Sequence, residues 1–137
     1  MTDYEGSCHC GAVGFRYTTD RPPHAWSVRA CQCSFCRKHD ALSTSDTAGQ
    51  LRFQCDDPNA LQRYRFALRT ADFLLCRRCG VYVGAVLDIA GERYGIINTH
   101  ALVNPPRDMA GVGAISYDAE ETDDRIRRRA ERWTPMN

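Results

Sequence analysis

Seven of the eight cysteines of this chain fall into three tight clusters. The clusters have the forms Cys-x-Cys at 8–10, Cys-x-Cys-x-x-Cys at 31–36 and Cys-x-x-Cys at 76–79. Each cluster can direct several sulfur atoms at one point, as metal-binding cysteines do in a reducing compartment. A disulfide framework is the alternative for a cysteine-rich chain, but it belongs to secreted proteins. We therefore interpret the spacing as metal binding.

Two of the clusters together supply the four ligands of a tetrahedral site. Cys76 and Cys79 lie in CRRCG, where Gly80 lets the backbone turn left-handed behind the second cysteine. Cys8 and Cys10 lie in CHCG, and residues two apart on a strand point to the same side. Zinc prefers four ligands in a tetrahedron. We predict a closed, structural zinc site on Cys8, Cys10, Cys76 and Cys79 that joins the first strand to a hairpin late in the middle of the chain.

The remaining cluster, Cys31, Cys33 and Cys36, is one ligand short. Three protein ligands with an open fourth position are typical of a catalytic zinc. Cys55 could complete the set, although a lone cysteine in a strand is more often a small core residue. We predict a second zinc at this trio, hence two zinc ions per chain, and we expect the second ion to be lost more easily.

The trio favours thiol chemistry over water activation. Three thiolates donate more electron density than three imidazoles, so zinc here should be a weak Lewis acid that holds an incoming thiol as a nucleophilic thiolate. Arg37, Lys38 and His39 follow the trio and could offset the negative charge, or they form an ordinary solvated turn. Iron also accepts four thiolates, but the Cys-x-Cys pair departs from the paired Cys-x-x-Cys knuckles of a rubredoxin-like site.

Short β-strands are the elements that must position these cysteines. Apolar residues alternate with period two, or form short β-branched and aromatic runs, at 12–19, 25–30, 50–54, 61–68, 71–76, 81–88 and 93–98. Turn-forming residues separate these segments, and paired prolines mark a loop over 103–111. The pattern predicts antiparallel β-structure with short connections. His100 follows the last of these strands and could approach a pocket or lie in the core.

One helix is predicted near the end of the chain, over 122–133. Thr122 or Asp123 could cap its N-terminus, and Pro135 would stop it. Apolar residues recur at helical spacing, at Ile126, Ala130 and Trp133. The helix also carries five arginines, Arg125, Arg127, Arg128, Arg129 and Arg132. They could contact nucleic acid, or they pair with nearby carboxylates on a solvated helix. Because they spread around the helix without interleaved exposed aromatic residues, we favour the solvated helix.

Length and charge limit the remaining possibilities. A chain of 137 residues is long enough for one domain, which we expect to span residues 1–137. The net charge of +1 gives no global field for nucleic acid or an anionic membrane. The opening MTDYEGSCHC has neither the basic nor the apolar region of a signal peptide, and no apolar stretch could cross a bilayer. We expect a cytoplasmic protein.

Three segments of the chain resemble a known family. GSCHCGAVGF at 6–15, CQCSFCRK at 31–38 and CRRCG at 76–80 are similar, in this order, to the glutathione-dependent formaldehyde-activating enzyme family, whose domain is shared with centromere protein V. RRAERWTP at 128–135 adds to the likeness. The resemblance implies a mainly β fold of the Mss4-like or β-tent kind, with zinc-bound antiparallel sheets and a short C-terminal helix. It also implies the same division of the cysteines into a structural and a second zinc site.

The resemblance implies a carbon–sulfur lyase activity, namely the reversible joining of glutathione and formaldehyde to S-hydroxymethylglutathione. Cys31, Cys33 and Cys36 would then serve catalysis as zinc ligands, with the glutathione sulfur at the open position. The expected partners are a small thiol such as glutathione and an aldehyde. The alternative is a non-catalytic, zinc-stabilised binding module in which an internal ligand such as Cys55 fills the second site.

Overall fold

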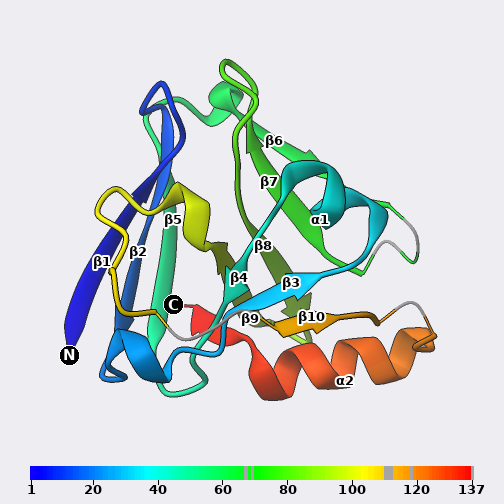
Figure 1. The fold of residues 1–137 in the computed structure, drawn as a ribbon. Coiled ribbons are helices and arrows are strands. Elements are labelled where there is room, and N and C mark those ends of the chain that lie inside the picture. Colours follow the sequence, from blue (N-terminus) through cyan, green and yellow to red (C-terminus); the bar gives the residue numbers. More distant parts are fainter. Residues whose placement is uncertain (67, 69, 110–112, 118, 137) are drawn as a thin grey trace.

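The computed structural model describes residues 1–66, 68, 70–109, 113–117 and 119–136 of the chain (Figure 1). Its strands are β1 Thr2–Ser7, β2 Val13–Thr19, β3 Arg29–Cys31, β4 Ser43–Thr44, β5 Gln50–Cys55, β6 Leu61–Tyr64, β7 Asp72–Cys76, β8 Tyr82–Ile89, β9 Glu92–Asn98, β10 Gly113–Ile115 and β11 Thr134–Met136. Its helices are α1 Ser34–His39 and α2 Thr122–Arg132, with short 3-10 turns η1 Pro23–Ala25, η2 Pro58–Ala60 and η3 Thr99–Ala101.

The eleven strands of the described residues form one hydrogen-bonded sheet that branches at β9. Strand β8 pairs along one edge of β9 and continues to β7 and β6. On the other edge, β11 leads to β5, β2 and β1, whereas β4 leads to β3 and β10. Only the β10–β3 and β11–β5 pairings are parallel among those described. Figure 1 shows α2 lying across one end of these strands. The predicted fold class, mainly β with antiparallel pairing and a short C-terminal helix, is confirmed.

Side chains that face one another across the long strands pack closely. Phe15 of β2 lies opposite Phe53 of β5, with ring centroids 6.0 Å apart. Gly84 lets β8 and β9 approach beneath this pair, because a Cβ atom there would lie 2.4 Å from the carbonyl oxygen of Ile96 and 2.7 Å from the ring of Phe53. The predicted strands at 50–54, 71–76, 81–88 and 93–98 correspond to β5, β7, β8 and β9, and that at 12–19 to β2.

Two of the predicted strands are shorter in the structure. The segment predicted at 25–30 is a strand only from Arg29, because Pro22 and Pro23 direct the chain into the turn η1. Trp26 and Val28 are nevertheless buried. The strand predicted at 61–68 ends at Tyr64, and residue 67 lies outside the described residues. The predicted loop at 103–111 contains no helix or strand over 103–109, and residues 110 and 111 are not described.

The predicted helix is α2, and it ends one residue earlier than expected. Its N-cap is Glu121 rather than Thr122 or Asp123, and no side chain caps the first turn. Pro135 does not simply stop the helix, because the chain turns at Trp133 into β11, where Pro135 pairs with Tyr94. In the part of the chain that the structure describes, no helix has the length and apolar character that crossing a membrane requires.

Buried side chains form two clusters. The first contains Phe15, Tyr17 and Trp26 and lies against β1, β2 and β5. The second includes Phe35 and Trp133 and joins α1, β7, β8 and β9 to the end of α2. One cysteine group borders each cluster, since Cys8 and Cys76 belong to the first and Cys36 belongs to the second.

Candidate functional site

Four cysteines meet where the β1–β2 and β7–β8 turns lie together. Their sulfur atoms all lie within 4.8 Å of one another, in the group Cys8, Cys10, Cys76 and Cys79. The Sγ atoms of Cys8 and Cys10 are 3.8 Å apart, and those of Cys10 and Cys76 are 3.6 Å apart. These distances are far longer than a disulfide bond of about 2.05 Å. All eight cysteines of the chain are free.

Local backbone geometry aims these sulfur atoms. The prediction of a strand at CHCG is wrong, because residues 9–12 form a turn in which Gly11 has a φ of 87°. The N–H of Val13 donates to the Cys8 sulfur at 3.3 Å. In the second turn, the N–H of Gly80 donates to the Cys76 carbonyl at 2.8 Å. Gly80 has a φ of 80°, so the predicted left-handed glycine is confirmed.

The four-cysteine group has the dimensions of a tetrahedral zinc site. With Zn–S bonds of about 2.3 Å, tetrahedral ligands lie about 3.8 Å from one another. The distances between the sulfur atoms of Cys8 and Cys10 (3.8 Å) and of Cys10 and Cys76 (3.6 Å) agree with this spacing. Burial acts to raise the pKa of Cys79, but hydrogen bonds from the Cys10 and Val81 backbone outweigh it and lower this pKa to about 6. The group could therefore hold a metal ion.

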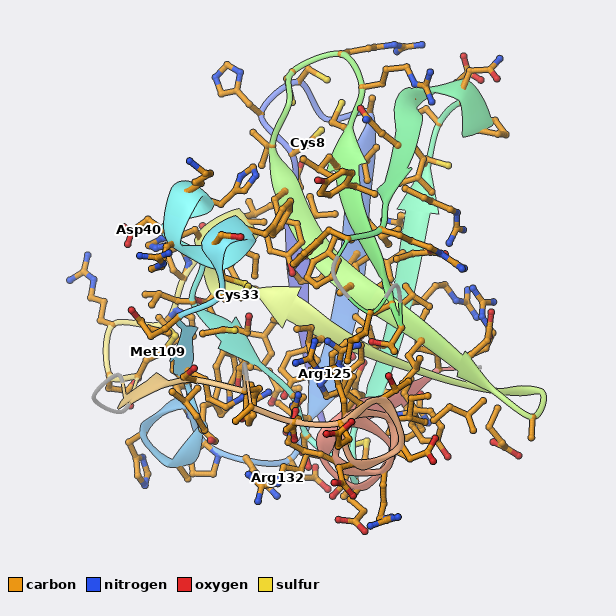
Figure 2. All side chains as sticks on the ribbon, turned by 90° about the vertical axis from the view of Figure 1, so that its right-hand side faces the viewer. Cys8, Cys33, Asp40, Met109, Arg125 and Arg132 are labelled. Atoms are coloured by element: carbon orange, nitrogen blue, oxygen red, sulfur yellow. The ribbon has the colours of Figure 1, made fainter. Side chains whose placement is uncertain are left out.

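The trio Cys31, Cys33 and Cys36 forms a second group, well apart from Cys8 (Figure 2). Cys31 ends β3, Cys33 is the N-cap of α1, and Cys36 lies in the first turn of that helix. The Cys33 sulfur accepts the N–H of Cys36 at 3.4 Å. Asp40 ends the helix in a left-handed conformation with a φ of 50°. Strand and helix thereby bring three sulfur atoms to one point.

The surroundings of Cys33 favour its thiolate. Hydrogen bonds from the thiols of Cys31 and Cys36 lower the pKa of Cys33 well below its ordinary value, against the effect of burial. Cys36 is buried, whereas Cys31 and Cys33 are half-buried. Among the described residues, no fourth cysteine, histidine or carboxylate joins the trio within the same 4.8 Å. This second group could also hold a metal ion.

A cavity of about 70 Å³ lies directly against the trio. Its lining includes the apolar side chains of Phe66, Phe73 and Trp133. It also includes four arginines, which we call the arginine wall: Arg29 from β3 and Arg125, Arg128 and Arg129 from α2. A larger surface hollow of about 370 Å³ adjoins the cavity, because Cys33, Phe66 and Arg125 line both. The trio is therefore reached through a partly apolar, positively charged space.

The arginines of this wall are largely withdrawn from solvent. The side chains of Arg125 and Arg128 are 13% and 15% exposed, and Arg129 is 8% exposed. Glu120 accepts two hydrogen bonds from Arg128, at 2.9 and 3.0 Å. Burial lowers the pKa of Arg129 to about 10, so this side chain stays charged at neutral pH. In Figure 2, Arg125 lies on the side of α2 nearer Cys33, and Arg132 lies on the other side.

The other candidate residues of the sequence lie outside the two cysteine groups. Cys55 ends β5 beside the first core cluster and belongs to neither cysteine group. His100 is exposed in η3, so it is not the core histidine considered above. Arg37, Lys38 and His39 form the exposed last turn of α1, and Arg37 lines the outer hollow. The sequence pattern did not indicate the arginine wall, because helical spacing does not show what packs against a polar face.

Comparison with known proteins places these features in a family. The model of the glutathione-dependent formaldehyde-activating enzyme family matches residues 3–116, which contain both cysteine groups. The chain belongs to this family. Helix α2, which carries three of the four wall arginines, lies beyond the residues matched by the family model.

Two individual proteins are similar to this chain. A protein of Halomonas elongata named "Putative glutathione-dependent formaldehyde-activating enzyme" is 56% identical over 34 residues. This segment is 25% of the chain and 20% of that curated relative, so the match spans about a fifth of its length. A crystal structure of a Rhodobacter sphaeroides protein superposes with a TM-score of 0.61 at 34% identity, covering 81% of this chain and 99% of that one.

Proposed function

We propose that this family member is a zinc-dependent enzyme of the carbon–sulfur lyase type, which adds a small thiol to an aldehyde and reverses that addition. Glutathione and formaldehyde, the reactants in the family's name, are the first candidates. The observation that carries the proposal is the position of the trio. Its three sulfur atoms converge at the wall of a cavity, and no fourth ligand of the described chain joins them.

Two zinc ions per chain are part of this proposal. Cys8, Cys10, Cys76 and Cys79 would hold a structural ion, and Cys31, Cys33 and Cys36 would hold the second. Zinc at the trio would supply the Lewis acidity that keeps a fourth, external sulfur ligand in its thiolate form at neutral pH. The single domain over residues 1–137 and the cytoplasmic location remain predictions.

The reaction needs no oxidant or reductant. The thiol sulfur forms a bond to the carbonyl carbon, the C=O π electrons move to oxygen, and that oxygen gains the proton that the thiol loses. The chain's own residues serve this addition in two ways. Phe66, Phe73 and Trp133 keep part of the cavity lining apolar and limit the access of water. The arginine wall offers positive charge where the thiolate and the developing alkoxide carry negative charge.

Cobalt substitution tests the proposal directly. We expect glutathione to change the thiolate-to-metal absorption of the cobalt-loaded wild type. The cobalt-loaded Cys55→Ser variant should show the same change, because Cys55 lies outside both cysteine groups. The Cys33→Ser variant should lose the response of the second site. With formaldehyde present, the wild type and Cys55→Ser should form S-hydroxymethylglutathione faster than the uncatalysed reaction, and Cys33→Ser should not.

The alternative function is a non-catalytic binding module stabilised by zinc. Complete indifference of the cobalt spectrum to glutathione, with two metal ions bound, would favour this module and contradict the enzyme. Cys55 is not positioned to be the internal fourth ligand of the second site in such a module, because its sulfur does not join the trio. The structure makes nucleic-acid binding by α2 less favourable than the sequence suggested, because three of its five arginines line the cavity.

A further inference from the structure

The arginine wall and Tyr117, which also lines the cavity, contain donors that have no hydrogen-bond acceptor among the described residues. Four buried side-chain atoms of the described residues have no hydrogen-bond partner, and three of them belong to the cavity lining. These three are the hydroxyl of Tyr117, Nε of Arg125 and Nε of Arg129. Arg129 is more than nine-tenths buried. Buried polar groups in native proteins are rarely left unpaired, so the hydroxyl of Tyr117 and Nε of Arg129 call for a partner. Nε of Arg125 lies 3.6 Å from the Glu120 carboxylate, which is an ion-pair distance but too long for a hydrogen bond.

All three of these atoms can donate a hydrogen bond, and two of them belong to cations. One other nitrogen atom of each arginine is already engaged, because Arg125 donates to the Tyr117 carbonyl at 2.8 Å and Arg129 donates to the Thr70 hydroxyl at 2.6 Å. Arg128 is held by Glu120 and lies over the Tyr117 ring, 3.4 Å from its centroid. These contacts hold the guanidinium groups in place, and the unpartnered Nε of Arg129 calls for an anionic acceptor.

The count of charges indicates how much negative charge is missing. Among the described residues, four arginines and the carboxylate of Glu120 leave three positive charges around the cavity. Three thiolates and a divalent zinc ion would contribute one negative charge, and an incoming thiolate would contribute a second. One further negative charge makes the site neutral. A thiol with one carboxylate supplies it, and so does glutathione, whose two carboxylates are offset in part by one ammonium group.

We propose that the arginine wall is a carboxylate subsite, which selects thiols that carry a carboxylate group over neutral thiols of the same size. This inference rests on the proposed thiol site at the trio, since the sulfur and the carboxylate of one ligand would bind side by side. Arg125, Arg129 and Tyr117 are the donors of the subsite. A carboxylate has the planar, two-oxygen shape that guanidinium groups recognise.

A pair of thiols that differ only in this charge tests the subsite. The dissociation constants of 3-mercaptopropionate and 3-mercaptopropionamide are measured by the absorption of the cobalt-loaded protein at neutral pH, where both free thiols are protonated. We expect the acid to bind about 10- to 100-fold more tightly, as a charge-assisted hydrogen-bonded pair should. Arg125→Gln and Arg129→Gln should each reduce this preference at least about tenfold.

Arg127→Gln is the matched control. Arg127 lies on the same helix but is 67% exposed, pairs with Asp124 and does not line the cavity, so its loss should leave the preference unchanged. If the buried Arg129 variant fails to fold, Arg125→Gln decides, because its side chain reaches the outer hollow. Equal affinity for the two thiols in the wild type, or an unchanged preference in Arg125→Gln, would overturn the subsite and leave the thiol site standing. Indifference of the spectrum to both thiols would instead refute the thiol site itself, and the inference with it.

Discussion

Loss of one ligand from the four-cysteine group should weaken the whole fold. We expect Cys76→Ser to lower the zinc content by one ion per chain and to reduce the free energy of unfolding. Zinc at this group would link Cys10 to Cys76, which are 66 residues apart in the chain. By the loop-entropy relation for cross-links, such a connection restricts the unfolded chain by about 4 kcal/mol at 25 °C. Since domains are stable by about 5–15 kcal/mol, the variant should be marginal.

Two other cysteine variants set the scale for this effect. The trio spans only the short segment from Cys31 to Cys36, for which the same relation gives about 2 kcal/mol. Cys33→Ser should therefore cost about half as much as Cys76→Ser. Cys55 is half-buried and outside both groups, so Cys55→Ser should cost about 1 kcal/mol or less. The order of the first two losses follows from the length of chain that each site connects, and the third is smallest because Cys55 connects nothing.

Urea unfolding followed by tryptophan fluorescence measures these differences. Trp26 and Trp133 are 2% and 4% exposed, and they lie in different core clusters, so the signal reports on the whole structure. In thermal unfolding followed by the same fluorescence, we expect the midpoint of Cys76→Ser to lie about 10–15 °C below that of the wild type. Chelation of the wild-type metal should produce a loss of at least this size. An unchanged zinc content, or stability within about 1 kcal/mol of Cys55→Ser, would refute the zinc cross-link.

Two further predictions concern the supports of the site. Gly84→Ala should lower the free energy of unfolding by about 1–3 kcal/mol, because its Cβ would lie 2.4 Å from the Ile96 carbonyl oxygen. Gly113→Ala, whose Cβ meets no atom within 4 Å, should change it by less than about 0.5 kcal/mol in the same urea titration, and equal effects would contradict the close approach of β8 and β9. Burial acts to raise the pKa of Glu120, but hydrogen bonds from Arg128 outweigh it and hold this pKa below its ordinary value. Glu120 therefore stabilises the fold above the ordinary glutamate pKa, and this contribution disappears as the pH falls through the lowered value. Glu120→Gln should be less stable than the wild type at neutral pH, and the difference should shrink in acid, whereas the exposed Glu131→Gln should match the wild type throughout. A gap between Glu120→Gln and wild type that stayed constant down to the acid limit would argue against this ion pair.

The cysteine groups could be anticipated because their information is local. Ligands two or three residues apart can meet at one ion whatever the rest of the fold does, and Gly80 marks its turn within the same five residues. The long strands were also predictable, since alternation shows directly which side chains face the core. Helix α1 was not predicted, because six residues show no clear period. Its ends depend on the Cys33 sulfur and on the left-handed Asp40, which only the backbone reveals.

The role of the α2 arginines depends on packing between distant parts of the chain. In the sequence, Arg125, Arg128 and Arg129 have the spacing and the acidic neighbours of a solvated helix. In the structure, the turn from Trp133 into β11 anchors the helix end beside β9, and one arginine-rich face meets the cavity. The residue that balances Arg128 is Glu120, eight positions away and outside the helix. Glu120 is one of the nearby carboxylates expected from the sequence to pair with the helix arginines, but the pair rule for residues three or four apart does not say which arginine it binds.

The two cysteine groups and the arginine wall come from different parts of the chain. The residues matched by the family model supply every cysteine of the two groups, whereas α2 lies beyond that match and supplies most of the cationic wall. Under the proposed function, the metal ligands and most of the charge around them therefore belong to different segments of the chain. If the thiol site and the carboxylate subsite are correct, a change of one or two arginines in α2 should alter which thiol binds without disturbing the trio. Selectivity would then depend on the last helix, and reactivity on the cysteines.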